Sequence, residues 1–148
     1  MKRREFVVFS LSALPFTAFC QTPNSHISTT DPLVFSFTKG RDVIPGKVRI
    51  ELPKIAENGH SVAMTVRVDS PMTAADHVKA VHMIAEKNPV REMAVFFFGP
   101  HSPRAEASTR IRLNGTQRIV AVAEFSNGTF WSDAVHIEVR EAACTDGG

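Results

Sequence analysis

The sequence predicts an all-β sandwich followed by a flexible C-terminal arm. Apolar residues recur at every second position in several short segments, which is the pattern of strands with one buried face. Asn-Gly and Pro-Gly turn signals separate these segments. The chain has 148 residues, of which 43% are hydrophobic, so it can form one domain with a substantial core.

The first half of the domain contains an expected pair of antiparallel strands. In residues 48–52 the apolar positions alternate with Arg49 and Glu51, and a similar alternation returns in residues 62–68. Asn58 and Gly59 lie between the two segments and favour a turn. Residues 33–37 come earlier and are expected to form a first strand or a short segment that packs on the core.

The second half is expected to add more strands. Residues 78–86 predict a strand, with a helix that starts near residues 74–76 as the alternative. Residues 94–98 are a continuous apolar run, which predicts a strand buried on both faces. Further strands are expected at residues 107–113, 119–125 and 135–140, and the Asn-Gly pairs at 114–115 and 127–128 are interpreted as hairpin turns.

The first twenty residues are typical of an export signal rather than of the fold. Basic residues at 2–4 precede an apolar run at 6–14 that is too short to span a membrane, and Ala18 and Cys20 supply small residues before a cleavage site. The adjacent Arg3 and Arg4 indicate the twin-arginine export route, with an ordinary secretory signal or a buried N-terminal strand as alternatives. We therefore expect a periplasmic protein with a signal peptide at 1–20, a linker at 21–31, a β-sandwich domain at 32–140 and the arm at 141–148.

Removal of the signal peptide changes the charge and the thiol content. The number of basic residues falls from 17 to 14 and the number of acidic residues from 15 to 14. A nearly neutral chain argues against nucleic acid or a membrane surface as a partner. Cys20 leaves with the signal peptide, so Cys144 is expected to be the one thiol of the exported chain.

The residue types that usually carry catalysis show no active-site pattern. No pair of the six histidines has the spacing of metal ligands, so we expect exposed or locally paired histidines and no metal site. No serine lies in a nucleophile-elbow motif, and no glycine-rich loop joins a strand to a helix. Arg104, Arg110 and Arg112 are interpreted as a solvated basic face, with a docking site for anions or a partner as the alternative. The sequence therefore predicts a protein that is not an enzyme and needs no cofactor.

The C-terminal tail offers one reactive group, Cys144. Residues 141–148 hold no large apolar side chain that could anchor them to a core, and Glu141 and Asp146 add negative charge that does not favour a thiolate. An accessible thiol without its own base suits a carrier whose partners do the chemistry. If the chain is free after Val139, Cys144 reaches roughly 17 Å at about 3.3–3.6 Å per residue. An incidental cysteine in an inert tail is the alternative.

Six segments of the chain carry a family resemblance: IELPKIAENG at 50–59, VDSPMT at 68–73, ADHVK at 75–79, AEKNP at 85–89, STRIRL at 108–113 and GTFWS at 128–132. With these segments the chain resembles the SoxY family, the periplasmic sulfur-carrier subunits of the thiosulfate-oxidation system. The twin-arginine signal and the C-terminal cysteine also match, so the resemblance covers nearly the whole chain.

The resemblance implies an immunoglobulin-like sandwich bound to a smaller β subunit, SoxZ. It also implies a swinging arm whose cysteine, Cys144 by matching position, holds the sulfur substrate covalently while enzymes of sulfur oxidation act on it. The usual family ending is Gly-Gly-Cys-Gly-Gly, and the present arm departs from it. Alanine restricts the backbone more than glycine does, so the cargo and the enzymes that service the arm stay open. The arm residues around the cysteine are Ala142, Ala143, Thr145, Asp146, Gly147 and Gly148.

Three hypotheses of different classes follow. The first is a non-enzymatic sulfur carrier on Cys144, in a heterodimer with a SoxZ-like subunit. The second is an immunoglobulin-like binding or interaction module with an inert tail. The third is a thiol redox enzyme, which is disfavoured because neither a second cysteine nor a base accompanies the thiol. The first hypothesis also predicts a disulfide-linked homodimer through Cys144 in the isolated protein.

Overall fold

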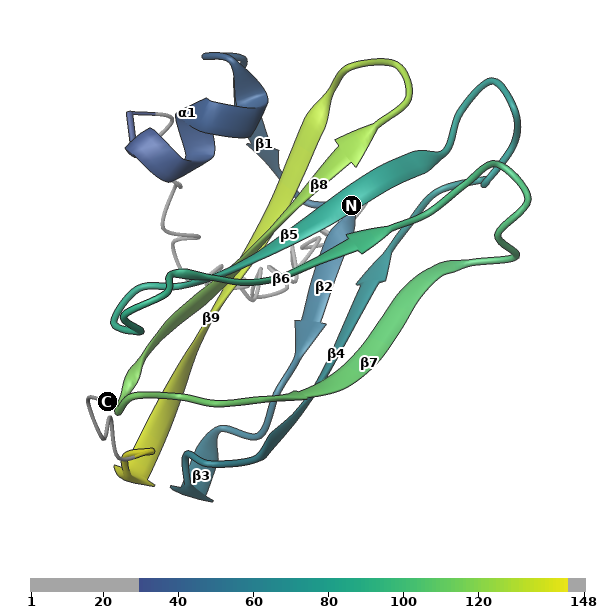
Figure 1. The fold of residues 1–148 in the computed structure, drawn as a ribbon. Helices are drawn as coiled ribbons and strands as arrows, with labels where there is room; N and C mark the ends of the chain where they lie inside the picture. Colours follow the sequence, from purple (N-terminus) through teal and green to yellow (C-terminus); the bar gives the residue numbers. More distant parts are fainter. Residues whose placement is uncertain (1–29, 144–148) are drawn as a thin grey trace, which may run out of the picture.

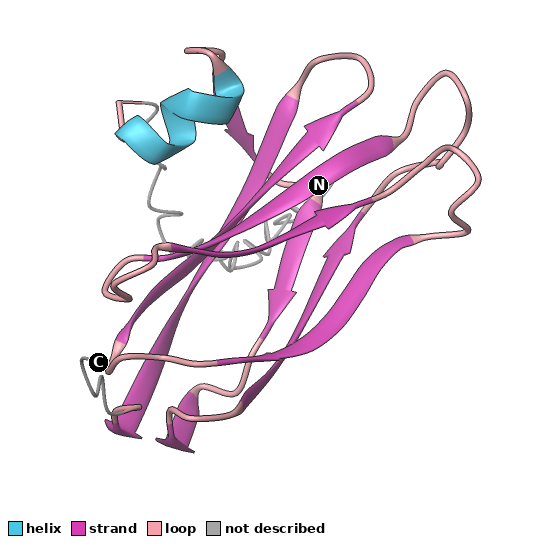
Figure 2. Ribbon diagram, in the orientation of Figure 1, coloured by secondary structure: helices cyan, strands magenta, loops and turns pink. Residues whose placement is uncertain are grey.

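Residues 30–143 are described by the computed structural model of the chain and fold into a β-sandwich with one short helix (Figure 1). Loops at both ends of the sandwich join the strands, as Figure 2 shows. Within these residues no helix is long and apolar enough to cross a membrane. The elements are α1 (Pro32–Thr38), β1 (Val43–Pro45), β2 (Val48–Glu51), β3 (Ile55–Asn58), β4 (Val62–Val68), β5 (Val78–Ala85), β6 (Glu92–Phe97), β7 (Ala105–Ile111), β8 (Gln117–Phe125) and β9 (Phe130–Glu141).

Two sheets make up the described part of the chain. One has the strand order β1-β9-β8-β5-β6, with β3 also paired to β9, and the other has the order β2-β4-β7. The expected neighbours at residues 48–52 and 62–68 are β2 and β4, which pair antiparallel with Val48 opposite Val68. The all-β sandwich predicted from the period of two is therefore confirmed.

Alternating burial along the strands forms the core between the sheets. In β4, Val62, Met64 and Val66 are buried while Ala63 and Arg67 face solvent. Strand β8 lies between β5 and β9 and is buried along almost its whole length. One face of β8 lines the core between the sheets, and Val120 and Val122 on its other face pack with Val34 of the helix, so β8 lacks the alternation of a strand with one solvated face.

The chain changes sheet after β2. Strand β2 pairs with β4 in the smaller sheet, and β3, which follows Pro53, pairs parallel with β9 in the larger one. Asp133 Oδ2 on β9 accepts a hydrogen bond of 2.9 Å from the Ile50 N–H on β2. The segment from β2 to β3 thus joins the two sheets along one side of the sandwich. Gly59, which follows β3, comes to lie beside the end of β9.

Strand β6 differs from its prediction. Residues 78–86 form strand β5 and not the alternative helix, but the neighbouring run at 94–98 is not buried on both faces. Strand β6 is half-buried and Phe97 is 80% exposed. The reason is position, because β6 is the last strand of its sheet and pairs only with β5 among the described strands.

Residues 33–37 form a helix, α1, rather than a strand. Asp31 caps the helix by accepting a hydrogen bond of 3.0 Å from the Leu33 N–H, and Pro32 occupies the first helical position. At the other end Lys39 takes a left-handed conformation with a φ of 56°, and its N–H bonds to the Phe35 carbonyl. Local capping thus overrode the strand propensity of this apolar run.

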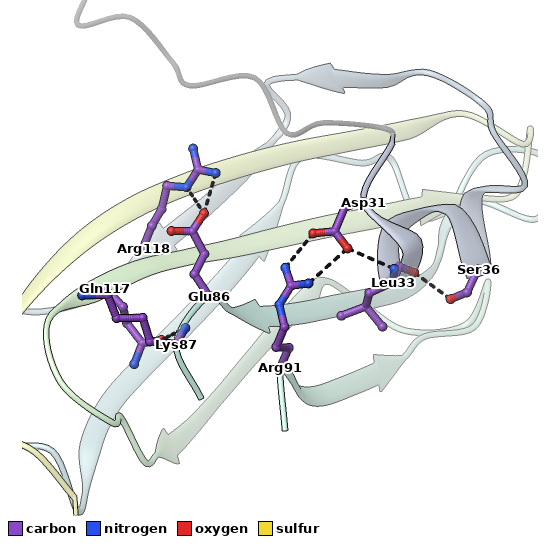
Figure 3. Close-up of polar contacts among 8 residues, drawn as sticks. All are labelled: Asp31, Leu33, Ser36, Glu86, Lys87, Arg91, Gln117 and Arg118. Atoms are coloured by element: carbon purple, nitrogen blue, oxygen red, sulfur yellow. Dashed lines mark hydrogen bonds and ion pairs between the residues drawn. The ribbon is translucent and has the colours of Figure 1, made fainter. Parts of the chain in front are cut away.

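Side chains attach α1 to the larger sheet (Figure 3). Both guanidinium nitrogens of Arg91 bond to the Asp31 carboxylate, at 2.6 and 3.2 Å. Phe37 stacks on His82 of β5 with ring centroids 3.9 Å apart and planes at 4°. Val34 is buried against the sheet. The expected packing of this segment on the sandwich is confirmed, with a helix in place of a strand.

One of the two Asn-Gly pairs is a hairpin turn. Asn127 and Gly128 join β8 to β9, which pair antiparallel, and Gly128 has a φ of 82°. Asn114 and Gly115 instead lie between β7 and β8, which belong to different sheets. The hairpin prediction at 114–115 is therefore wrong, because this loop carries the chain across the sandwich.

Candidate functional site at the C-terminal tail

Three segments that are distant in sequence meet where the tail leaves the domain. The Gly59 N–H donates to the Glu141 carbonyl (2.8 Å), the Leu113 N–H to the Gly59 carbonyl (2.9 Å), and the Ala143 N–H to the Leu113 carbonyl (3.1 Å). Figure 1 shows β3, the loop after β7 and the end of β9 converging at this end of the sandwich. We call Gly59, Leu113, Glu141 and Ala143 the tail anchor.

Gly59 leaves no space for a side chain. A Cβ on this residue would stand 2.9 Å from the Ala143 nitrogen and still closer to the Leu113 carbonyl oxygen. Real Cβ atoms essentially never approach other atoms within 3.0 Å. The backbone of Gly59 is not in the left-handed region, so glycine is required here by close packing and not by its dihedral freedom.

The half-buried side chain of Asn88 and the buried side chain of Gln117 hold the loop that carries Leu113. Asn88 Nδ2 donates to the Arg112 carbonyl (2.8 Å), and Asn88 Oδ1 accepts from the Asn114 N–H (3.0 Å). Gln117 is buried and donates from Nε2 to Asn88 Oδ1 (3.0 Å). A connected network of this kind, here partly buried, restrains its surroundings, so the Leu113 carbonyl is presented to the tail at a defined place.

Of the expected arm at 141–148, the structure describes residues 141–143. Strand β9 continues through Glu141, Ala142 is exposed, and Ala143 is buried with its N–H bonded. In this conformation the chain after Val139 is held to the domain as far as Ala143. The reach of about 17 Å, which assumes a chain that is free after Val139, therefore does not apply to Cys144 here. The missing large apolar side chain did not leave the start of the tail unanchored, because backbone groups hold it. Cys144, Thr145, Asp146, Gly147 and Gly148 lie outside the described residues, as do Arg3, Arg4 and Cys20.

The tail anchor supplies position but no acid or base. Its contacts are peptide N–H and C=O groups, and its buried side chains are those of Leu113 and Ala143. Glu141 is exposed and contributes its carbonyl oxygen to the anchor. The arrangement can hold the chain in front of Cys144, while the chemistry on the thiol would have to come from groups outside the anchor.

The described histidines are exposed or locally paired, as expected. His82 Nδ1 lies 2.8 Å from Glu92 Oε1, and His77 Nδ1 lies 3.0 Å from the Thr73 carbonyl. Among residues 30–143 there is no group of three histidine, cysteine, aspartate or glutamate side chains that could hold a metal ion.

The three arginines do not form one basic group. Arg110 bonds to Ser61, whereas Arg104 and Arg112 belong to opposite ends of β7. Arg104 lines a cavity of about 510 Å³ at the end away from the tail, beside Arg67, whose pKa is raised mainly by its hydrogen bond to Glu106 and also by Glu51. The cavity is therefore not part of the tail anchor.

Sequence reasoning missed Gly59 and Leu113 as site residues. Both appear in the segments that carry the family resemblance, at the ends of IELPKIAENG and STRIRL. Gly59 was interpreted only as a turn residue and Leu113 only as a strand residue. The contacts that join them are backbone contacts between segments more than fifty residues apart, for which the side-chain pattern carries no signal.

Solved structures with the same fold include a sulfur carrier and superoxide reductases. The sulfur carrier protein SoxY from Chlorobium limicola f thiosulfatophilum matches with a TM-score of 0.64 and 22% identity, over 76% of this chain and 92% of that one. The superoxide reductase (neelaredoxin) from Ignicoccus hospitalis matches with a TM-score of 0.56 and 17% identity, over 64% and 80%. A putative superoxide reductase from Thermotoga maritima matches with a TM-score of 0.57 and 19% identity, over 71% and 91%. At these identities the matches define the fold class, an immunoglobulin-like β-sandwich, and no more.

The family comparison separates the two classes. Residues 36–144 match the family described as sulfur oxidation protein SoxY. The comparison with curated proteins yields no match. The chain belongs to the SoxY family. Membership supports a sulfur carrier in sulfur oxidation rather than an enzyme, and it implies partnership with SoxZ and sulfur-oxidation proteins in general.

Proposed function

We propose that the protein is a periplasmic carrier that holds sulfur intermediates covalently on Cys144 and presents them to partner enzymes. The observation that carries the proposal is the extent of the family match, which runs to residue 144 and so includes the cysteine. The tail anchor adds support, because it ends one residue before that cysteine. The anchor contains no base of its own, which suits a thiol that is serviced by other proteins.

Loading of such a thiol can proceed by exchange. The Cys144 thiolate attacks the outer sulfur of a persulfide on a partner, or the cargo sulfur of a disulfide between the partner and its cargo. A new S–S bond forms on Cys144, and the partner's thiolate leaves. One S–S bond forms and one breaks, so this step needs no electron acceptor. Later oxidation or hydrolysis of the cargo belongs to the partner enzymes.

The partner and the compartment are part of the same proposal. A SoxZ-like β subunit is proposed as the heterodimer partner. Among the described strands β6 is paired along one edge only, and its last residue, Phe97, is exposed, which suits the addition of a partner strand. Export is proposed through the twin-arginine signal at Arg3 and Arg4.

Mass spectrometry of the protein from sulfur-oxidising cells tests the proposal. We expect a periplasmic chain that lacks residues 1–20, sulfur-containing mass adducts that reductant removes, and no adducts in Cys144→Ser. Native mass spectrometry should show a complex of this chain with a SoxZ-like chain. Cys20→Ser is the matched control, and it should keep the adducts because Cys20 leaves with the signal peptide.

The alternative of a binding module with an inert tail makes the opposite prediction. An unmodified thiol during sulfur oxidation, together with full function in Cys144→Ser, would sink the carrier proposal.

A further inference from the structure

The state of the tail anchor determines how far Cys144 can stand from the domain. Ala143 is buried and hydrogen-bonded, and adjacent Cα atoms are about 3.8 Å apart across a trans peptide. With the anchor closed, Cys144 is therefore one peptide link from a fixed residue. When the anchor opens and Glu141 also leaves its place opposite Asn58 in the β3–β9 pair, the chain is free as far back as Val139, and the reach grows to roughly 17 Å.

We propose that Gly59 and Leu113 are positioning residues that hold the base of the carrier arm through Ala143. The closed anchor fixes the chain as far as Ala143, and a longer arm becomes available to a recessed partner site only when the anchor opens. The inference rests on the proposed function for the identity of the cargo. The position of the thiol itself is a property of this chain and can be measured without any cargo.

The contacts make the anchor a separable unit. Opening it breaks the bonds from Gly59 to Glu141 and from Ala143 to Leu113 and uncovers the buried Ala143. Full release back to Val139 also separates Glu141 from Asn58 at the end of the β3–β9 pair and breaks the exposed ion pair of Arg140 with Glu57 (3.2 Å). Farther back, Val139 stays attached because its N–H donates to Thr116 Oγ1 (2.9 Å). The ladder between β8 and β9 begins at Gln117 and Ile137 and is also untouched. The base of the tail can therefore detach while the sandwich remains folded.

Glycine at position 59 makes the closed state possible. Any side chain there would push against the Leu113 carbonyl and the Ala143 nitrogen at once, which are the acceptor and the donor of the bond that fixes the tail. Gly99 offers a matched comparison, because a Cβ there would meet nothing within 4 Å and its φ is not positive.

Spin labelling of Cys144 tests the proposal. A nitroxide is attached to Cys144 in the full chain carrying Cys20→Ser, and its mobility is measured by electron paramagnetic resonance. We expect a restricted label in the parent chain, a clearly more mobile label in Gly59→Ala, and an unchanged label in Gly99→Ala. Equal mobility in all three proteins, or equal gains in both glycine variants, would overturn the proposal.

A second variant keeps the test valid if Gly59→Ala fails to fold. Ala143→Pro removes the N–H that bonds to Leu113 and leaves Gly59 and Leu113 unchanged. We expect the label to become mobile and the Gly59 amide to exchange with solvent about fivefold faster or more, the factor that the loss of one hydrogen bond gives. An unchanged label in this variant contradicts the anchor.

The two proposals fail in different ways. A rigid label that Gly59→Ala releases, combined with a thiol that never carries sulfur, would retain the anchor and reject the carrier. Sulfur adducts on Cys144 with a label that no variant alters would retain the carrier and reject the anchor.

Discussion

The two ends of the described chain are attached to the sandwich by different kinds of contact. Helix α1 is held by side chains, through the ion pair of Asp31 with Arg91 and the stack of Phe37 on His82. The tail is held by peptide groups of the tail anchor and by burial of the small Ala143. Both segments border regions outside the described residues, yet the four residues of the tail anchor are joined by neither ion pairs nor aromatic contacts. The ion pair beside the anchor, of Arg140 with Glu57 (3.2 Å), lies between two exposed side chains.

The difference teaches what each attachment responds to. Side-chain contacts depend on residue identity and ionisation, so pH and salt modulate them. Peptide hydrogen bonds do not titrate near neutral pH, and they depend on shape, above all on the space left by Gly59. A carrier arm held in this way would keep its base position across pH, and substitutions should separate the two ends.

Leu113→Ala is expected to have the largest effect. Its side chain is fully buried, so truncation should lower the free energy of unfolding by about 2–5 kcal/mol. Chemical denaturation measures the loss, and amide exchange at Ala143 should rise further than at α1. Leu33→Ala is the matched control at the helix end, where the leucine is only partly buried. An equal loss in both variants would contradict this ranking.

Phe37→Ala should detach the helix end with a smaller effect. The side chain is partly buried and stacked on His82, so we expect a loss of about 1–3 kcal/mol in the free energy of unfolding. Phe35 is 54% exposed, and Phe35→Ala should change stability by no more than about 0.5 kcal/mol. Amide exchange at Ala143 should stay unchanged in both. A rise at Ala143 would show that the two attachments are coupled.

Asp31→Asn should have the smallest effect and the clearest pH dependence. The hydrogen bond from Arg91 lowers the pKa of Asp31 below the ordinary value of an aspartate. The stability from this pair is therefore present above the unfolded pKa and is lost as pH falls through the lower folded pKa. Asparagine keeps the helix cap, so the variant should lose less than about 1 kcal/mol at neutral pH, given the partial exposure of the pair.

The pH and salt profiles check that assignment. Stability curves of Asp31→Asn and the parent chain should converge in acid, and high salt should narrow their difference at neutral pH. A difference that persists unchanged below the folded pKa would assign the effect to the helix cap instead of the ion pair.

Much of the sandwich could be predicted from the sequence because strands with one buried face leave a local pattern. The alternation at residues 62–68 and the strand at 78–86 were confirmed for this reason. The edge position of β6 was missed, because an apolar run does not show how many neighbours a strand will have. The loop at Asn114 and Gly115 was missed as a crossover, because a turn signal does not show which sheet receives the next strand.

For the candidate site, the sequence by itself determined the residue types: a tail of small residues, a cysteine at position 144 and the segments that resemble the family. Only the tertiary structure decided that Gly59 and Leu113 meet Ala143 and hold the start of that tail. The physical reason is that peptide N–H and C=O groups are the same in nearly every residue. Which of them pair is set by the path of the chain between the sheets, and that path is a property of the whole fold.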